Sequence, residues 1–292
     1  MQNRMSISRL RATGVVLVMA VAGFTFEVTS QAADVQRKVE THQTATGETF
    51  GSWGPLPTKP TPTLFVLAST MSETLGDAYF RQCGNALSAE GYLLVSIDLP
   101  CHGREHRDGE PAGLAGWRYR CEQGDDFVAD SNKRFARVLD HLISAGHTDA
   151  VKVAACGTSR GGYLALHFAA HDARVKCVAA FAPVTELAAL REFHGAAKNA
   201  LALSLALNRQ AEKLAGRAVW IIIGDQDERV GTDHAIDLAR LTTKAALAKK
   251  LPSRVDLHVV AEPRGHTTPA GAPEQSAAWI LRQIATDVSS RR

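Results

Sequence analysis

Short, continuous apolar runs alternate with longer stretches of helical periodicity along this chain, and this alternation limits its fold more than any other feature. Apolar runs of this kind are typical of strands that are buried on both faces of a parallel sheet. We therefore predict an α/β fold with a mostly parallel central sheet and helices on both faces. The expected strands are 64–68, 92–98, 151–156, 175–181, 218–223 and 255–260. The expected helices are 74–89, 125–145, 161–171, 234–249 and 273–288.

The composition is that of a folded domain rather than a disordered or nucleic-acid-binding chain. Hydrophobic residues make up 45% of the 292 residues and charged residues 22%, which is ordinary for globular proteins. The formal net charge is only +3, so no nucleic-acid partner is expected. One catalytic domain is predicted over 63–292. It follows a polar segment, 34–62, that is expected to hold one or two edge strands and a linker.

The first 33 residues have the pattern of a secretory signal. Three arginines precede a short apolar run, 15–26, and the small residues Ser30, Ala32 and Ala33 follow it. This run is shorter than the ~20 residues that a membrane span needs, so a cleaved signal over 1–33 is favoured over an uncleaved anchor. We expect export to a periplasm or beyond, with no membrane span in the mature chain.

The sequence Gly157-Thr158-Ser159-Arg160-Gly161 lies directly between an expected strand and an expected helix. A serine on so sharp a turn needs glycine on both sides, because side chains there would clash. The turn presents the hydroxyl above the sheet and directs amides of the following helix at an oxyanion formed beside it. This setting predicts a nucleophilic serine rather than an ordinary glycine-rich turn.

A serine nucleophile needs a base, and the base needs an acid that orients it. Two expected strand ends supply these groups in the order Ser, Asp, His. Asp225 and Asp227 follow the run 218–223, and His266 follows the run 255–260. Carboxyl ends of parallel strands meet at one edge of a sheet, so these side chains are expected near the serine.

With these residues in place, the chain resembles the α/β-hydrolase superfamily of serine hydrolases over the expected catalytic domain. The loop pattern of Gly224, Asp227 and Val230 resembles the dienelactone hydrolase and prolyl-oligopeptidase-like branch. The resemblance makes Asp227 the acid. Asp225 is the rival candidate, and its alternative role is to cap the turn with its own side chain. It also implies that His266 is the base and that no metal or organic cofactor takes part.

In this superfamily two backbone amides bind the oxyanion. One belongs to Arg160, directly after the serine. Alignment of the first strand end gives Thr70 as the other donor, with Ser69 next in line. Many members have His-Gly in that loop, whereas this chain reads Ala68, Ser69, Thr70 and Met71. The missing glycine does not remove a donor, because every non-proline residue has an amide N–H.

Three side chains are candidates for lining the pocket: Met71, Arg160 and Trp117. Arg160 would bind an acidic substrate group, pair with a site carboxylate or anchor its own loop through an ion pair. Trp117 would line the pocket or pack its excursion down. Cys101 and Cys121 flank that excursion, and an oxidising compartment permits a disulfide between them.

Residues 184–217 are rich in leucine and lie between two expected strands. They form either a small helical cap over the site or a plain crossover helix with an irregular lead-in. No cysteine pair in the sequence has the spacing of a zinc finger, so no metal is expected.

These residues predict a hydrolase whose substrate is a small ester or another acyl compound. A carboxylesterase is the preferred interpretation. The alternative enzyme is a small serine peptidase or amidase of the prolyl-oligopeptidase-like branch, without the propeller domain that its larger relatives carry. A non-catalytic binding protein on the same scaffold is the alternative from another class.

Overall fold

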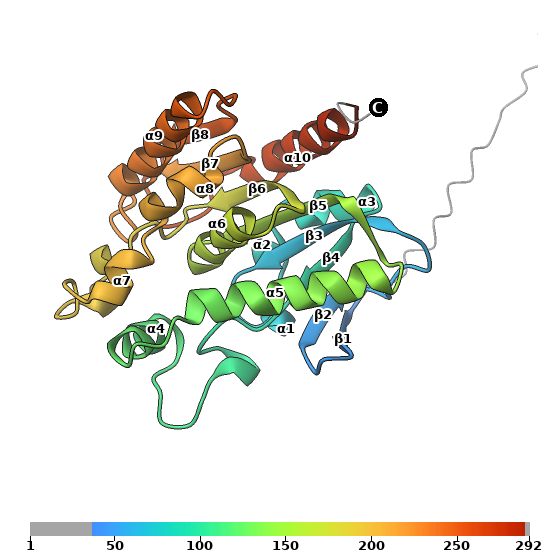
Figure 1. Ribbon diagram of the computed structural model, residues 1–292, viewed down its shortest axis with the longest axis horizontal. Helices are drawn as coiled ribbons and strands as arrows, with labels where there is room; N and C mark the ends of the chain where they lie inside the picture. Colours follow the sequence, from blue (N-terminus) through green and yellow to red (C-terminus); the bar gives the residue numbers. More distant parts are fainter. Residues whose placement is uncertain (1–36, 290–292) are drawn as a thin grey trace, which may run out of the picture. The chain divides into compact units, whose positions relative to one another are not determined.

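The computed structural model describes residues 37–289, so the expected signal over 1–33 lies outside the described residues. Within them, an eight-stranded sheet has the order β1-β2-β4-β3-β5-β6-β7-β8 (Figure 1). The strands are β1 (Val39–Gln43), β2 (Thr49–Trp53), β3 (Thr61–Leu67), β4 (Leu93–Ser96), β5 (Thr148–Thr158), β6 (Val175–Phe181), β7 (Ala218–Gly224) and β8 (Val255–Val260).

The sheet is mostly parallel, which confirms the predicted fold class. Every neighbouring pair from β4 through β3, β5, β6 and β7 to β8 is parallel. The antiparallel pairs of this sheet are β1 with β2 and β2 with β4, and both β1 and β2 come from the segment 34–62. The loops that follow β3, β5, β7 and β8 therefore leave the same edge of the sheet, where ligand sites of such sheets lie.

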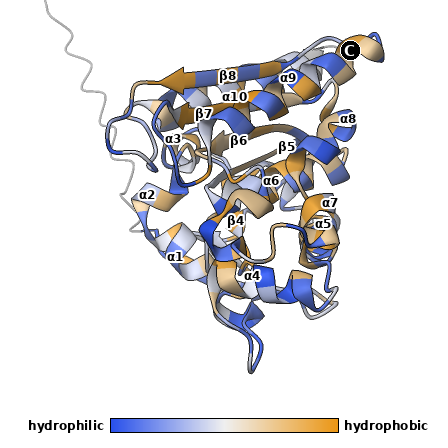
Figure 2. Ribbon diagram, turned by 90° about the vertical axis from the view of Figure 1, so that its left-hand side faces the viewer, coloured by the Kyte–Doolittle hydropathy of each residue, from blue (hydrophilic) through white to orange (hydrophobic). Residues whose placement is uncertain are grey.

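Helices cover both faces of the sheet. They are α1 (Met71–Gly76), α2 (Ala78–Arg81), α3 (Gly84–Ala89), α4 (Gly113–Glu122), α5 (Phe127–Ser144), α6 (Arg160–His171), α7 (Ala200–Ser204), α8 (Ala211–Leu214), α9 (Thr232–Ala248) and α10 (Ala272–Ser289). Phe65 and Leu67 of β3 enter one core with residues of α5 and α6. Leu64 and Val66 enter a second core with residues of α3 and α10. Figure 2 shows the inner strand β6 mainly in hydrophobic colours. No helix within 37–289 is long and apolar enough to cross a membrane.

The region predicted as one helix over 74–89 forms three short helices instead. Asp77 has an extended backbone, ends α1 and caps α2 by accepting a hydrogen bond from the Tyr79 amide at 2.8 Å. Gln82 has φ 49° and ψ −127°, which no α-helix contains, and it separates α2 from α3. Apolar periodicity does not reveal either break, because both depend on polar side chains.

The excursion between β4 and α5 contains α4, a helix that the sequence analysis did not predict. Trp117 of α4 is fully buried and donates from Nε1 to the Pro100 carbonyl at 2.8 Å. Its ring lies 4.7 Å from that of Phe127 and 5.7 Å from that of Tyr163. Trp117 therefore has the second of the two roles considered for it: it packs the excursion against the core and has no surface exposed to an open pocket.

A buried ion pair also stabilises this excursion. The Arg120 guanidinium lies 2.8 Å from the Glu110 carboxylate. Burial raises the pKa of Glu110, but hydrogen bonds from Arg120 and from the Arg107 amide outweigh it and lower the pKa to about 2. Cys101 and Cys121 are buried free thiols, so the disulfide considered between them is not formed.

Residues 184–217 contain no long crossover helix. Their helical turns are η2 (Leu187–Ala189), η3 (Arg191–Phe193), α7, η4 (Leu207–Gln210) and α8. The turn η3 and helix α7 pack against α4 (Figure 1). Arg118 of α4 joins the two segments by donating to the His194 carbonyl at 3.0 Å. The role of this segment as a cap remains a prediction.

Candidate active site

The turn from β5 to α6 has the shape that a nucleophile elbow requires. Ser159 has φ 54° and ψ −116°, a backbone conformation that residues other than glycine rarely adopt. A Cβ atom on Gly157 would overlap the backbone of Gly161, and a Cβ on Gly161 would overlap the Leu67 carbonyl. The Ser159 amide donates to the Phe181 carbonyl at 2.9 Å. Both glycines are thus required by close approach of the backbone.

His266 lies between the serine and a buried carboxylate. Its Nε2 atom is 3.0 Å from Ser159 Oγ, and its Nδ1 atom is 2.8 Å from Asp227 Oδ2. The Asp227 side chain is fully buried, whereas 27% of the His266 side chain is exposed. The other oxygen, Oδ1, accepts hydrogen bonds from the amides of Arg229 at 3.1 Å and Val230 at 3.3 Å. An Nδ1–H donated to Asp227 leaves Nε2 to accept the serine proton.

Asp225 has a different set of contacts. Its side chain accepts a hydrogen bond from the Glu262 amide at 3.0 Å, and its own amide donates to the Val260 carbonyl at 2.8 Å. These contacts tie the loop after β7 to the loop after β8. Within residues 37–289, Asp225 makes no hydrogen bond to His266.

The loop after β3 leaves one amide unbonded between two that are bonded. The Ser69 amide donates to Thr74 Oγ1 at 3.1 Å, and the Met71 amide donates to Asp98 Oδ1 at 2.8 Å. The Thr70 amide has no acceptor among the described residues, and neither has the Arg160 amide at the start of α6. Thr70 rather than Ser69 therefore has a donor free for a ligand.

Arg160 is anchored beside this loop. Its Nε donates to the Ala68 carbonyl at 2.9 Å, and no carboxylate of residues 37–289 lies within ion-pair distance of it. The pKa of Arg160 lies below its usual value, because burial and the nearby Arg229 outweigh the opposing effect of Glu73 and Glu192. The side chain thus anchors the loop through a carbonyl group rather than through either of the ion pairs considered for it.

Met71 is almost completely buried. It is only 5% exposed, and a Cβ built on Gly51 of β2 would touch its side chain. The side chain thus packs mainly onto the sheet, and its role in lining a pocket stays a prediction.

Asp98 is a site residue that sequence reasoning missed. Its carboxylate also accepts the Arg104 amide at 2.8 Å, and a Cβ on Gly103 would lie 2.5 Å from its Oδ2 atom. Asp98 thus shapes both the loop after β3 and the turn at His102 and Gly103. An acidic residue at the end of an otherwise apolar strand run was the available signal.

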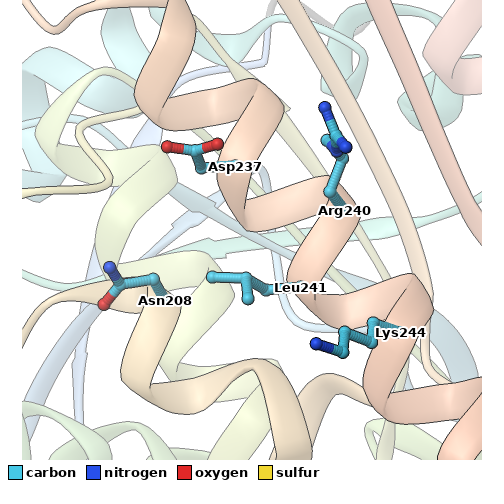
Figure 3. Close-up of a pocket in the computed structure, with 5 residues that line it drawn as sticks. All are labelled: Asn208, Asp237, Arg240, Leu241 and Lys244. Atoms are coloured by element: carbon cyan, nitrogen blue, oxygen red, sulfur yellow. The ribbon is translucent and has the colours of Figure 1, made fainter.

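A separate cavity of about 680 Å³ lies on η4 and α9 (Figure 3). None of the candidate catalytic residues lines it. Its lining residues are Asn208, Asp237, Arg240, Leu241 and Lys244. In the described part of the chain, no cluster of three His, Cys, Asp or Glu side chains is arranged to hold a metal ion.

Solved structures with similar folds include both esterases and peptidases. Dipeptidyl peptidase 4 of Porphyromonas gingivalis aligns with a TM-score of 0.61 and 18% identity over 84% of this chain, and the chain spans only 35% of that protein. Acetyl xylan esterase 1 of Thermoanaerobacterium sp. JW/SL YS485 aligns with a TM-score of 0.58 and 16% identity, over 86% of this chain and 89% of the esterase. A cold-adapted esterase from an Arctic intertidal metagenomic library aligns with a TM-score of 0.58 and 19% identity, over 85% and 93%.

At these identities the solved structures establish the fold, which is that of the α/β-hydrolases. No curated protein matches the sequence significantly. The family described as serine aminopeptidase, S33, matches residues 63–219, more than half of the 292-residue chain. The protein therefore belongs to this family of α/β-hydrolase-fold serine hydrolases.

Proposed function

We propose that this protein is a carboxylesterase that acts through an acyl-enzyme on Ser159. The observation that carries the proposal is the hydrogen-bonded series from Asp227 through His266 to Ser159. The unbonded amides of Thr70 and Arg160 at the same edge of the sheet support it. Together these groups supply the nucleophile, base, orienting acid and oxyanion donors that acyl transfer needs.

In the proposed reaction, Ser159 Oγ attacks the ester carbonyl carbon while His266 Nε2 accepts the hydroxyl proton. Asp227 holds the imidazole in place and stabilises its positive charge. The two amides bind the negative charge that develops on the carbonyl oxygen. The C–O bond to the alcohol then breaks, and His266 gives its proton to the departing oxygen. Water, activated by His266, releases the acid from the acyl-enzyme.

A serine peptidase is the second candidate, because the matching family is described as an aminopeptidase and a dipeptidyl peptidase shares the fold. The same side chains would cleave an amide by the same steps. A carboxylesterase is preferred because the esterases align over most of their own length, whereas the chain spans about a third of the peptidase.

The test is a hydrolysis screen of the wild-type protein and Ser159→Ala. It uses p-nitrophenyl esters of rising chain length and aminoacyl and prolyl p-nitroanilides. We expect turnover of esters that falls by about 10⁴-fold or more in the variant. A preference for anilides would replace the esterase with the peptidase. If the folded wild-type protein hydrolyses nothing and no fluorophosphonate labels Ser159, the protein is a binding protein instead.

The role of Asp227 is tested against Asp225 as a matched control. We expect Asp227→Asn to lower kcat by about 10³–10⁴-fold, because the histidine loses the partner that fixes its tautomer. Asp225→Asn leaves the bond to His266 intact and should lower kcat less than about tenfold. The reverse order of the two effects would assign the acid to Asp225.

We further propose that the protein is exported after cleavage of residues 1–33. The basic start, apolar run and small residues of that segment support this proposal. N-terminal sequencing of the protein from the exported fraction of producing cells should begin near Asp34. Recovery of the intact N-terminus in the membrane fraction would point to an uncleaved anchor.

A further inference from the structure

Gln82 has a backbone conformation that favours glycine, although it is not glycine. Its φ of 49° and ψ of −127° nearly repeat those of Ser159, which are 54° and −116°. Strained conformations of this kind persist where surrounding contacts hold them, and they cluster at functional sites. Glycine would adopt this conformation without strain, so the glutamine side chain needs an explanation.

The side chain of Gln82 joins two segments that carry candidate catalytic residues. It is 1% exposed, and its Nε2 donates to Thr158 Oγ1 at 3.0 Å and to Thr268 Oγ1 at 2.8 Å. Thr158 directly precedes Ser159, and Thr268 follows His266 by two residues. One buried amide therefore bridges the end of β5 and the histidine loop.

The histidine loop needs such an anchor. It runs from β8 to α10 without a helix or strand of its own. The Thr268 amide donates to the Tyr79 hydroxyl at 3.3 Å, so α2 and the residue that follows it hold the loop at two points. The serine, by contrast, lies on a turn fixed by its glycines and by β6.

We propose that Gln82 is a positioning residue that sets the distance between Ser159 and His266, an inference that rests on the proposed function. Proton transfer needs heavy atoms within about 2.6–3.2 Å, and the Ser159 Oγ to His266 Nε2 distance is 3.0 Å. The bridge fixes the histidine loop against the strand end that carries the serine. The strained backbone at Gln82 directs its amide at both threonines.

The first test variant is Gln82→Gly, which removes the side-chain amide. Glycine adopts the backbone conformation at this position without strain, so the turn should keep its shape. We expect kcat for p-nitrophenyl acetate to fall about 10–100-fold with little change in KM, because small displacements of catalytic groups have effects of this size. The rate of fluorophosphonate labelling should fall by the same factor, because labelling uses the same proton transfer.

Thr268 provides a matched pair of variants that leaves the backbone of Gln82 unchanged. Thr268→Val removes the acceptor and should lower kcat and the labelling rate about tenfold. Thr268→Ser restores a hydroxyl and should return both rates to within about twofold of wild type. These variants keep the proposal testable if Gln82→Gly does not fold.

The outcomes separate this inference from the proposed function. Wild-type labelling rates in folded Gln82→Gly and Thr268→Val would overturn the inference and leave the esterase proposal standing. Lower thermal stability with unchanged labelling of the folded protein would give Gln82 a purely structural role, which also overturns it. Absence of labelling in the wild-type protein would overturn the proposed function and this inference with it.

Discussion

The turn after β5 and the loop after β3 leave adjacent parallel strands at the same edge, yet two different physical means give them their shapes. The turn takes its shape because two of its residues have no side chain. Gly157 and Gly161 have no Cβ, and any Cβ there would overlap backbone atoms. Such a requirement is visible in a sequence, because only one residue type satisfies it.

The loop after β3 is shaped by hydrogen bonds from side chains. Thr74 accepts from the Ser69 amide, Asp98 accepts from the Met71 amide, and the Thr70 hydroxyl accepts from the Glu73 amide at 3.1 Å. Each of these acceptors has chemical equivalents, so no single residue type marks the loop. Because these hydrogen bonds hold the backbone, the loop keeps an unbonded amide without the His-Gly pair that many members of the superfamily have there.

The largest effect that would test this comparison is expected from Gly161→Ala. The added Cβ must displace the Leu67 carbonyl at the end of β3, so the turn and the neighbouring strand shift together. We expect loss of measurable esterase activity and a decrease in the free energy of unfolding of about 3 kcal/mol, the upper end of the usual cost of overpacking. Chemical denaturation and p-nitrophenyl acetate hydrolysis measure the two quantities.

Gly76→Ala is the matched control for this substitution. Gly76 ends α1, and a Cβ there would meet no atom within 4 Å. Alanine should therefore leave activity unchanged and slightly stabilise the protein. Equal effects of the two alanines would show that close approach does not shape the turn.

Most of the fold was predictable because continuous apolar runs and helical periodicity mark its elements directly. The runs 175–181 and 255–260 coincide with β6 and β8. Elements that depend on polar contacts were not predictable in this way. The break at Gln82 requires two buried threonine hydroxyls from distant segments, and α4 lies in a polar excursion. Its spacing of Leu114, Trp117 and Cys121 was the available signal.

The candidate site likewise contains residues that apolar patterns predict and residues that they do not. Ser159, Asp227 and His266 each follow an apolar strand run, and parallel strands bring such ends to one edge of the sheet. The place of Asp98 at a strand end was visible in the sequence, but the contacts of Asp98 and Gln82 could not be predicted, because a single buried polar residue carries no periodicity. Their partners are set by tertiary packing rather than by spacing along the chain.

The loop is tested by a smaller change, Thr70→Pro, which removes the only amide of this loop that is proposed to bind the oxyanion. Thr70 has φ −79° and ψ 153°, values that proline adopts without strain. We expect kcat to fall by about 10²–10³-fold, the usual effect of losing one oxyanion donor. Steady-state kinetics on p-nitrophenyl acetate measure this, with circular dichroism to check the fold.

Thr70→Ala is the control, because proline also removes the hydroxyl that caps α1 through the Glu73 amide. Alanine keeps the amide and should lower the free energy of unfolding by about 1 kcal/mol while kcat stays within severalfold of wild type. The difference between the two variants then reports the amide alone. If alanine lowers kcat as much as proline does, the loop contributes through its cap rather than through a donor. The contrast between a turn shaped by glycine and a loop shaped by hydrogen bonds would remain, but the loop would no longer have a part in binding the oxyanion.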